Sequence, residues 1–190
     1  MTQPQERLVL DKQGIRRALK KMASEVVSEN PDLDTLAFVG IRTRGVPLAE
    51  RLAKNVDESE GSDVPVGMLD ITLYRDDVGI AYPNPVIKPT RLPFELTGMT
   101  IILVDDVLNT GRTVRAALDA LMDFGRPEAI RLAVLVDRGL RELPIRADYV
   151  GKTLETTRED DVLVQLEEVE ASDRVIVTKI RKPAGEVHDG

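Results

Sequence analysis

The sequence contains no cysteine and no tryptophan, and its one histidine, His188, stands two residues from the C-terminus in a polar stretch. The absence of cysteine excludes disulfides, thiolate metal sites and cysteine nucleophiles, and it favours a reducing compartment, so we expect a cytoplasmic protein. The position of the histidine argues against Ser-His-Asp triads, His-based acid–base catalysis and His-rich metal sites. The chemistry left to the chain is that of carboxylates, guanidinium groups, backbone N–H groups and a divalent metal.

Long hydrophobic runs are also lacking. The longest apolar stretches have the length of a strand, so the sequence predicts neither a membrane span nor a secretory peptide. Aromatic residues make up only 3% of the 190 residues, but 42% are hydrophobic and 31% are charged, which is typical of one compact globular domain. The net charge of −7 argues against overall attraction to nucleic acid but not against a local basic face. We expect a single domain over residues 1–182 and a polar tail over residues 183–190.

Short apolar runs alternate with amphipathic segments along the chain. Strands are predicted at residues 36–41, 64–74, 99–104 and 130–136, and helices at residues 11–29, 46–56 and 112–124. This alternation predicts an α/β fold with a doubly wound, mostly parallel sheet that binds ligands beyond the carboxyl ends of its strands. We expect a small hood or lid from the proline-containing arm 75–91 and two late strands, at residues 162–166 and 175–177.

The most informative stretch is VDDVLNTGRT, residues 104–113, at the end of the third predicted strand. A glycine turn that leads into a helix offers free N–H groups and the positive end of the helix dipole, which together favour a phosphate. Asp105 and Asp106 would repel that phosphate, so a diol or a ligand-bound divalent cation is their better partner. A phosphorylated sugar meets both demands. The alternative is a strand end and a helix cap that bind no ligand.

Residues 101–113 resemble the phosphoribosyl diphosphate (PRPP) signature of the type I phosphoribosyltransferases. The form VDDVLNTGRT is most similar to the PyrR family, pyrimidine-operon regulators that are also uracil phosphoribosyltransferases. Residues 40–45, 69–77, 136–139 and 141–148 also resemble runs of this family, so the resemblance covers roughly residues 10 to 180.

The resemblance implies the type I phosphoribosyltransferase fold and transfer of the 5-phosphoribosyl group from PRPP to uracil, which gives UMP and diphosphate. It implies Mg²⁺ bound mainly through PRPP, with no metal site made by the protein alone. Asp105, Asp106 and Arg44 are the expected catalytic residues, and the loop at residues 43–45 is expected to bind diphosphate and to hold a non-proline cis peptide. The expected substrate-binding residues are Thr43, Arg44, Gly45, Arg75, Lys88, Arg91, Asp105, Asp106, Val107, Leu108, Asn109, Thr110, Gly111, Arg112, Thr113, Asp137, Arg138 and Ile145.

Within that set, the resemblance gives each segment a role. The two aspartates hold the ribose hydroxyls, and residues 109–113 hold the 5-phosphate. Cations of the arm at residues 75–91 meet diphosphate while the arm excludes water. Asp137, Arg138 and nearby backbone groups at the end of the strand at residues 130–136 are expected to read the uracil edge, and Ile145 is expected to pack on the base.

The resemblance also implies binding to the leader mRNA of pyrimidine genes, strengthened by uridine nucleotides. The expected RNA-binding residues are Arg16, Arg17, Lys20, Arg141, Arg146 and Lys152. Two departures from the family pattern bear on this function: Leu140 stands where the family usually has His, and residues 153–157 replace a run that usually contains Pro. A solvated helix face explains the first basic cluster equally well.

Two alternatives remain open from the sequence. One is an RNA-binding regulator whose nucleotide pocket is a vestigial sensor, and the other is a purine phosphoribosyltransferase. The resemblance implies a homodimer or a higher homo-oligomer.

Overall fold

The computed structural model describes residues 6–76 and 89–179. Its centre is a five-stranded sheet with the order β3-β2-β4-β5-β6, in which every neighbouring pair of strands is parallel. The doubly wound parallel sheet predicted from the sequence is therefore confirmed. The strands are β2 (Leu36–Ile41), β3 (Val66–Leu69), β4 (Thr100–Leu108), β5 (Ala129–Asp137) and β6 (Tyr149–Thr153).

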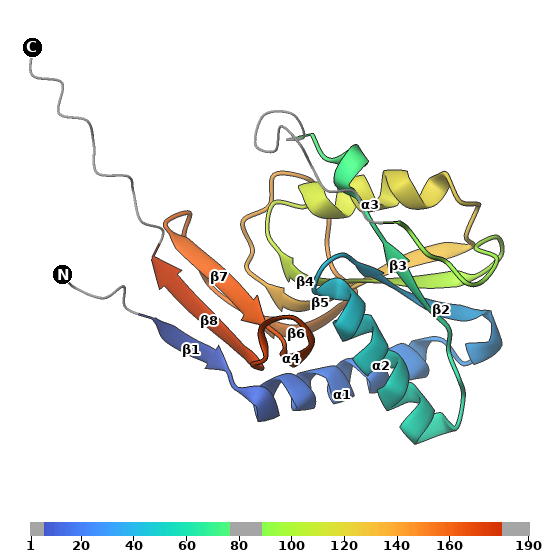
Figure 1. The fold of residues 1–190 in the computed structure, drawn as a ribbon, viewed down its shortest axis with the longest axis horizontal. Helices are drawn as coiled ribbons and strands as arrows, with labels where there is room; N and C mark the ends of the chain where they lie inside the picture. Colours follow the sequence, from blue (N-terminus) through green and yellow to red (C-terminus); the bar gives the residue numbers. More distant parts are fainter. Residues whose placement is uncertain (1–5, 77–88, 180–190) are drawn as a thin grey trace, which may run out of the picture.

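Helices cover both faces of this sheet (Figure 1). The helices α1 (Lys12–Glu29) and α2 (Gly45–Glu60) lie on one face, and α3 (Arg112–Met122) lies on the other. Successive residues of β4 point to opposite faces, so Ile102 joins the core under α1 and α2 while Leu103 joins the core under α3. Both side chains are fully buried, and burying a side chain of this size stabilises the fold by about 1.5–3 kcal/mol.

A second, smaller sheet forms the hood. It is antiparallel, with the order β1-β8-β7, and consists of β1 (Arg7–Leu10), β8 (Arg174–Lys179) and β7 (Asp160–Gln165). The short helix α4 (Glu167–Glu170) lies between β7 and β8 in the chain. The two late strands are thus confirmed as part of a hood, but its third strand comes from the N-terminal segment, which the sequence analysis had not assigned.

Other differences from the predicted elements have local causes. The strand predicted at residues 64–74 ends at Leu69, because Asp70 accepts a hydrogen bond from the Thr72 N–H at 2.8 Å and turns the chain into the short 3-10 helix η2 (Thr72–Tyr74). A further 3-10 turn, η1 (Leu33–Thr35), precedes β2. Strand β4 runs on past its predicted end at residue 104, because its pairing with β5 continues to Leu108.

Strand β6 was missed because only two of its five residues, Tyr149 and Val150, are large and apolar. The arm at residues 77–88, the domain end predicted at residue 182 and the tail at residues 183–190 lie outside the described residues. Within the part of the chain that is described, no helix is both long and apolar enough to cross a membrane.

Candidate active site

Strands β2 and β4 are parallel neighbours, so the loops that follow them open at the same edge of the sheet. The loop after β2 contains a cis peptide bond between Arg42 and Thr43, as the resemblance implied for this segment. It then passes so close to β4 that a Cβ atom on Gly45 would lie 2.3 Å from the carbonyl oxygen of Val104. Glycine is required there, because it lets the start of α2 approach the strand that carries the two aspartates.

Asp105 and Asp106 extend from β4 at this edge. Each carboxylate accepts a hydrogen bond from the next backbone N–H: Asp105 from Asp106 N at 2.9 Å, and Asp106 from Val107 N at 2.8 Å. Burial, and then the neighbouring charge of Asp106, raise the pKa of the Asp105 carboxyl well above its usual value. Burial also raises the pKa of Asp106, but the Arg44 guanidinium opposes this effect. The two adjacent acids therefore have different environments.

Arg44 lies between two carboxylates. Its Nη1 is 3.9 Å from Oδ2 of Asp106, while its Nε and Nη2 donate to Oε1 of Glu170 at 3.0 and 2.6 Å. The structure thus brings Arg44 and Asp106, which are 62 positions apart in the chain, within 3.9 Å of each other. The sequence analysis had not singled out Glu170, because it is one of several acids in the stretch before β8.

The loop after β4 leads into α3 through Gly111, whose φ of 94° lies in the left-handed region. No side chain among the described residues caps α3 in the usual way; the nearest contact is a 3.3 Å hydrogen bond from the Arg112 N–H to the Thr110 hydroxyl. The N–H groups and dipole of this helix end are therefore available to bind an anion. A hollow of about 240 Å³ opens here, lined by Arg75, Asp76, Thr110, Arg112 and Thr113.

A larger hollow of about 490 Å³ shares Thr110 with the first. Its other lining residues come from the loops after β4 and β5 and from the hood: Asn109, Arg138, Gly139, Leu140, Arg141, Glu142, Arg158, Asp160 and Asp161. The Asn109 side-chain oxygen is buried without a hydrogen-bond partner among the described residues. This hollow has the size expected for a small-molecule site. Two hollows, one beside the helix end and one beside the β5 loop, thus share Thr110 in their linings.

The side chains predicted to read the base have other partners. The Arg138 guanidinium is buried and donates to Thr156 Oγ1, Thr157 O and Asp160 O, so it ties the β5 loop to the start of β7. Asp137 accepts from Arg141 Nη2 at 2.6 Å. These contacts differ from the expectation that both side chains face uracil, because buried polar groups take the hydrogen-bond partners that the fold supplies.

Ile145 also has a different place from the predicted one. It is partly buried in the core under α3, where a Cβ on Gly111 would lie 3.4 Å from its side chain, and it is not among the residues lining the larger hollow. Ile145 therefore packs beneath the turn at Gly111 that leads into α3.

The cations expected from the arm are separated in the structure. Arg75 lines the smaller hollow, and its charge lowers the pKa of Asp105, against the larger effect of burial. Arg91 exchanges two backbone hydrogen bonds with Met68 at the edge of β3 and does not line either hollow. Lys88 lies outside the described residues. Arg112 donates to Asp76 at 2.6 Å and to Glu142 at 2.8 Å, so it connects the start of the arm with the β5 loop.

Of the predicted RNA-binding residues, five have exposed side chains. Arg16, Arg17 and Lys20 are exposed on α1, and Arg146 and Lys152 are exposed at and near β6, the strand against which α1 packs. Arg141 differs: its guanidinium donates to Ile145 O, Leu108 O, Asn109 O and Asp137, and it is mostly buried. Arg141 thus differs from the open surface charge expected of an RNA-binding residue, because its guanidinium holds carbonyl groups of the loop after β4.

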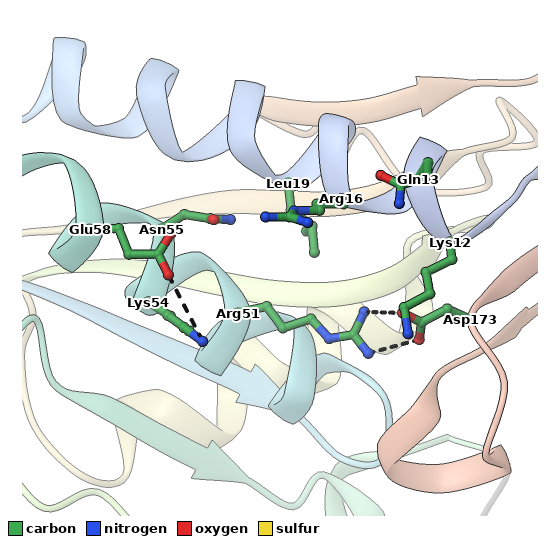
Figure 2. A pocket seen from close by; sticks show the side chains of 9 residues that line it. All are labelled: Lys12, Gln13, Arg16, Leu19, Arg51, Lys54, Asn55, Glu58 and Asp173. Atoms are coloured by element: carbon green, nitrogen blue, oxygen red, sulfur yellow. Dashed lines mark hydrogen bonds and ion pairs between the residues drawn. The ribbon is translucent and has the colours of Figure 1, made fainter.

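Another hollow, of about 370 Å³, lies between α1 and α2 (Figure 2). Three of its cations already have carboxylate partners: Lys12 pairs with Glu167, Arg51 with Asp173 and Lys54 with Glu58. Since these charges are balanced within the chain, this hollow is a weaker anion site than the helix end at α3.

The donor set bears on the metal that the resemblance implied. No group of three or more metal-ligating side chains occurs among the described residues. Asp105 is buried and the Asp106 side chain is 21% exposed, so Asp106 presents its carboxylate more openly at this edge of the sheet; Mg²⁺ is commonly held by one or two carboxylates together with substrate phosphates and waters. These residues therefore fit a magnesium ion carried by the substrate.

Comparison with known proteins agrees with this geometry. The Phosphoribosyl transferase domain family matches residues 8–171. Several curated relatives named "Bifunctional protein PyrR" are similar over most of the chain. One from Deinococcus radiodurans is 57% identical and spans 92% of this chain and 95% of the relative. One from Pelotomaculum thermopropionicum is 56% identical and spans 89% of this chain and 93% of the relative. One from Thermus aquaticus is 60% identical and spans 85% of this chain and 89% of the relative.

Solved structures show the same fold at low identity. A hypoxanthine phosphoribosyltransferase of Trypanosoma cruzi is 16% identical with a TM-score of 0.71, over 95% of this chain and 94% of the other. One from Staphylococcus aureus is 18% identical with a TM-score of 0.65, over 92% of each chain. The type I phosphoribosyltransferase fold is thereby confirmed, and the high identity to the curated relatives narrows the assignment. The chain belongs to the PyrR family of phosphoribosyltransferases.

Proposed function

We propose that this protein transfers the 5-phosphoribosyl group of PRPP to N1 of uracil, giving UMP and diphosphate, and that it regulates pyrimidine genes through uridine-nucleotide-dependent binding to leader mRNA. One observation carries the catalytic part: the Arg44 loop, the Asp105–Asp106 pair and the open end of α3 meet at one edge of the sheet. Membership of the PyrR family carries the choice of uracil and of RNA.

The reaction needs charge placement more than acid–base strength. When the bond between C1 of ribose and diphosphate breaks, the sugar gains oxocarbenium character and the leaving group gains negative charge. We assign Arg44 to the diphosphate, Asp105 and Asp106 to the ribose hydroxyls, and residues 109–113 to the 5-phosphate. This division explains how a chain with a single terminal histidine can support the transfer.

We propose that Mg²⁺ enters with PRPP, where it neutralises diphosphate charge when bound. Asp105 and Asp106 are the residues that would contact it. The uracil ring is assigned to the larger hollow beside the β5 loop, where backbone groups of residues 138–140 and the unpartnered Asn109 oxygen supply polar contacts. The sequence analysis assigned the base to Asp137, Arg138 and nearby backbone groups, and this proposal keeps the backbone groups.

For RNA, we propose the exposed cations of α1 and of the β6 region: Arg16, Arg17, Lys20, Arg146 and Lys152. The acid-rich stretch at residues 155–173 is excluded as an RNA contact by its charge. A homo-oligomer and a cytoplasmic location also belong to this proposal, the second because nascent leader mRNA is found there.

A turnover assay with PRPP, Mg²⁺ and a panel of bases tests the catalytic part, and titration of UMP against leader RNA in a filter-binding assay at fixed salt tests the regulatory part. We expect turnover with uracil and tighter RNA retention with UMP. Turnover with hypoxanthine or guanine alone would identify a purine enzyme. Retention of RNA without turnover would identify a regulator with a vestigial pocket.

A further inference from the structure

Glu170, at the end of α4, is the residue that the structure holds most closely against Arg44. Oε1 of Glu170 accepts from both Nε and Nη2 of Arg44, at 3.0 and 2.6 Å, and Oε2 accepts from the backbone N–H of Leu166 at 2.9 Å. The side chains of Arg44 and Glu170 are 38% and 21% exposed, so this pair is partly shielded from water. Both oxygens of one carboxylate are therefore occupied, one by the guanidinium and one by the backbone.

The acidic turn that carries this carboxylate, defined here as residues 167–173, is itself fastened to the helical layer. Arg51 of α2 donates to Glu168 at 2.6 Å and to Asp173 at 2.8 Å, and Figure 2 shows the double contact with Asp173. Burial lowers the pKa of Arg51, but hydrogen bonds to these two acids outweigh this effect and raise it. Lys12 of α1 pairs with Glu167 at 2.5 Å. The turn that carries Glu170 is thus held by contacts that do not involve Arg44.

The carboxylate of Glu170 sets the position of the Arg44 guanidinium. An arginine side chain carries about 2 kcal/mol of rotamer entropy, and a guanidinium held along one edge has already lost much of it. With Nε and Nη2 on Glu170, Nη1 is left toward the crevice at 3.9 Å from Asp106. Without Glu170, we expect Arg44 to collapse onto Asp106, where it would occupy a carboxylate assigned to ribose.

We propose that Glu170 is a positioning residue for PRPP: it presents the Arg44 guanidinium to the diphosphate and keeps it off Asp106. This inference rests on the proposed phosphoribosyl transfer and adds a hood residue to that site. If Glu170 instead repelled the negative diphosphate, its removal would tighten diphosphate binding. The same variants therefore distinguish the two roles.

The experiment uses the full-length protein with Glu170→Ala, Glu170→Gln and the control Glu155→Ala, which removes an exposed acid outside the acidic turn. Calorimetry gives the Kd of magnesium diphosphate and the Kd of UMP, and steady-state kinetics gives KM for PRPP and kcat with uracil. We expect Glu170→Ala to weaken diphosphate binding and raise KM for PRPP roughly tenfold, the effect of about 1.4 kcal/mol. UMP binding should stay within about twofold, because UMP has no diphosphate at this position. Glu170→Gln should recover only part of the loss, since its amide oxygen can accept from Arg44 but its NH2 group cannot accept from the Leu166 N–H.

Three results would overturn the inference: diphosphate binding to Glu170→Ala that is unchanged or tighter, an equal loss in Glu155→Ala, or an equal loss of UMP binding in Glu170→Ala. The last two would show a general effect on the fold. If the wild-type protein bound neither magnesium diphosphate nor UMP, the proposed function would fail first, and this inference with it.

Discussion

At the scale of single residues, the two neighbouring aspartates of β4 differ in what the fold does to them. Asp105 is buried, with 7% of its surface exposed, and its neighbour adds a like charge, whereas Asp106 lies near Arg44. A carboxyl group whose folded-state pKa is raised stabilises the fold only at low pH. Ionisation of Asp105 therefore destabilises the free protein, and a ligand with hydroxyl groups or a cation at this carboxylate would offset that effect.

Asp105→Asn is expected to raise the thermal stability of the ligand-free protein at neutral pH. In the wild type, the folded chain binds more protons than the unfolded chain between the ordinary aspartate pKa and the raised pKa of Asp105, so its stability falls as pH rises through that window. The gain in Tm from the substitution should therefore shrink as the pH is lowered toward 4, the ordinary range of aspartate. Scanning calorimetry across this range measures it.

The control for that experiment is Asp63→Asn, which removes an exposed aspartate. Its effect on Tm should be small throughout the pH range. A wild type more stable than Asp105→Asn at pH 8 would contradict the assignment of a raised pKa to Asp105.

Asp106→Asn is expected to impair transfer without unfolding the protein. The amide keeps the size of the side chain but removes the charge assigned to the ribose and its metal, so kcat/KM for PRPP should fall by roughly 10²-fold. Steady-state kinetics and circular dichroism measure the two effects. Turnover like that of the wild type would remove Asp106 from the catalytic residues.

At the scale of the elements, the site depends on how closely two loops approach one strand. The start of α2 lies on β4 through Gly45, and the start of α3 follows β4 through Gly111. The two helices lie on opposite faces of the sheet, but both begin at the edge where β2 and β4 end (Figure 1). Small changes in backbone packing at this edge should therefore alter binding of both ends of PRPP.

Gly45→Ala is expected to destabilise the protein and to reduce PRPP binding together. The new methyl group would lie 2.3 Å from the Val104 carbonyl oxygen, so the backbone must shift, at a cost of about 1–3 kcal/mol. The matched control is Gly14→Ala, also a buried glycine near the start of a helix, whose Cβ would meet only side-chain atoms at 3.1 Å. Denaturant unfolding of both variants makes the comparison, and equal stabilities would contradict the close approach at Gly45.

At the scale of the whole molecule, the two proposed activities use different parts of the fold. PRPP and uracil are assigned to the carboxyl edge of the sheet, between the hood and the loops, whereas RNA is assigned to α1 and the β6 region. Arg141 belongs to the first group, because its guanidinium holds Leu108 and Asn109 carbonyls of the phosphate loop. Surface charge and site geometry can therefore be changed separately.

Arg17→Gln and Lys20→Gln are expected to weaken leader-RNA binding and to leave uracil turnover unchanged. Each lost phosphate contact should reduce the slope of log K against log salt by about 0.7–1. Arg141→Gln should behave in the opposite way, raising KM for PRPP with little change of salt slope. Filter binding at several salt concentrations and kinetics on the same preparations test this; a large salt-slope change in Arg141→Gln would contradict its assigned role.

Local pattern predicted the elements with a strong signal of their own. The run LAFVGI matches β2 from Leu36 to Ile41 without error, because a strand buried on both faces needs apolar residues throughout. Pairing partners set the other boundaries: β4 runs through its two aspartates because Leu108 finds Asp137 on β5, and β1 exists because β8 lies beside it. The residues of β4 do not reveal that β5 lies beside them, and the residues of β1 do not reveal that β8 does.

By itself, the sequence determined the alternating α/β order, the phosphate loop at the end of β4 and the family, because apolar periodicity and a contiguous signature are properties of neighbouring residues. Tertiary structure decided which charges are free. The guanidinium groups of Arg138 and Arg141 form hydrogen bonds to backbone carbonyls inside the protein. Glu170 accepts hydrogen bonds from Arg44, which is 126 positions away in the chain. Hydrogen-bond partners of a charged side chain are chosen by distance and burial in the folded protein, and residues so far apart in sequence meet only after the sheet and the hood have assembled.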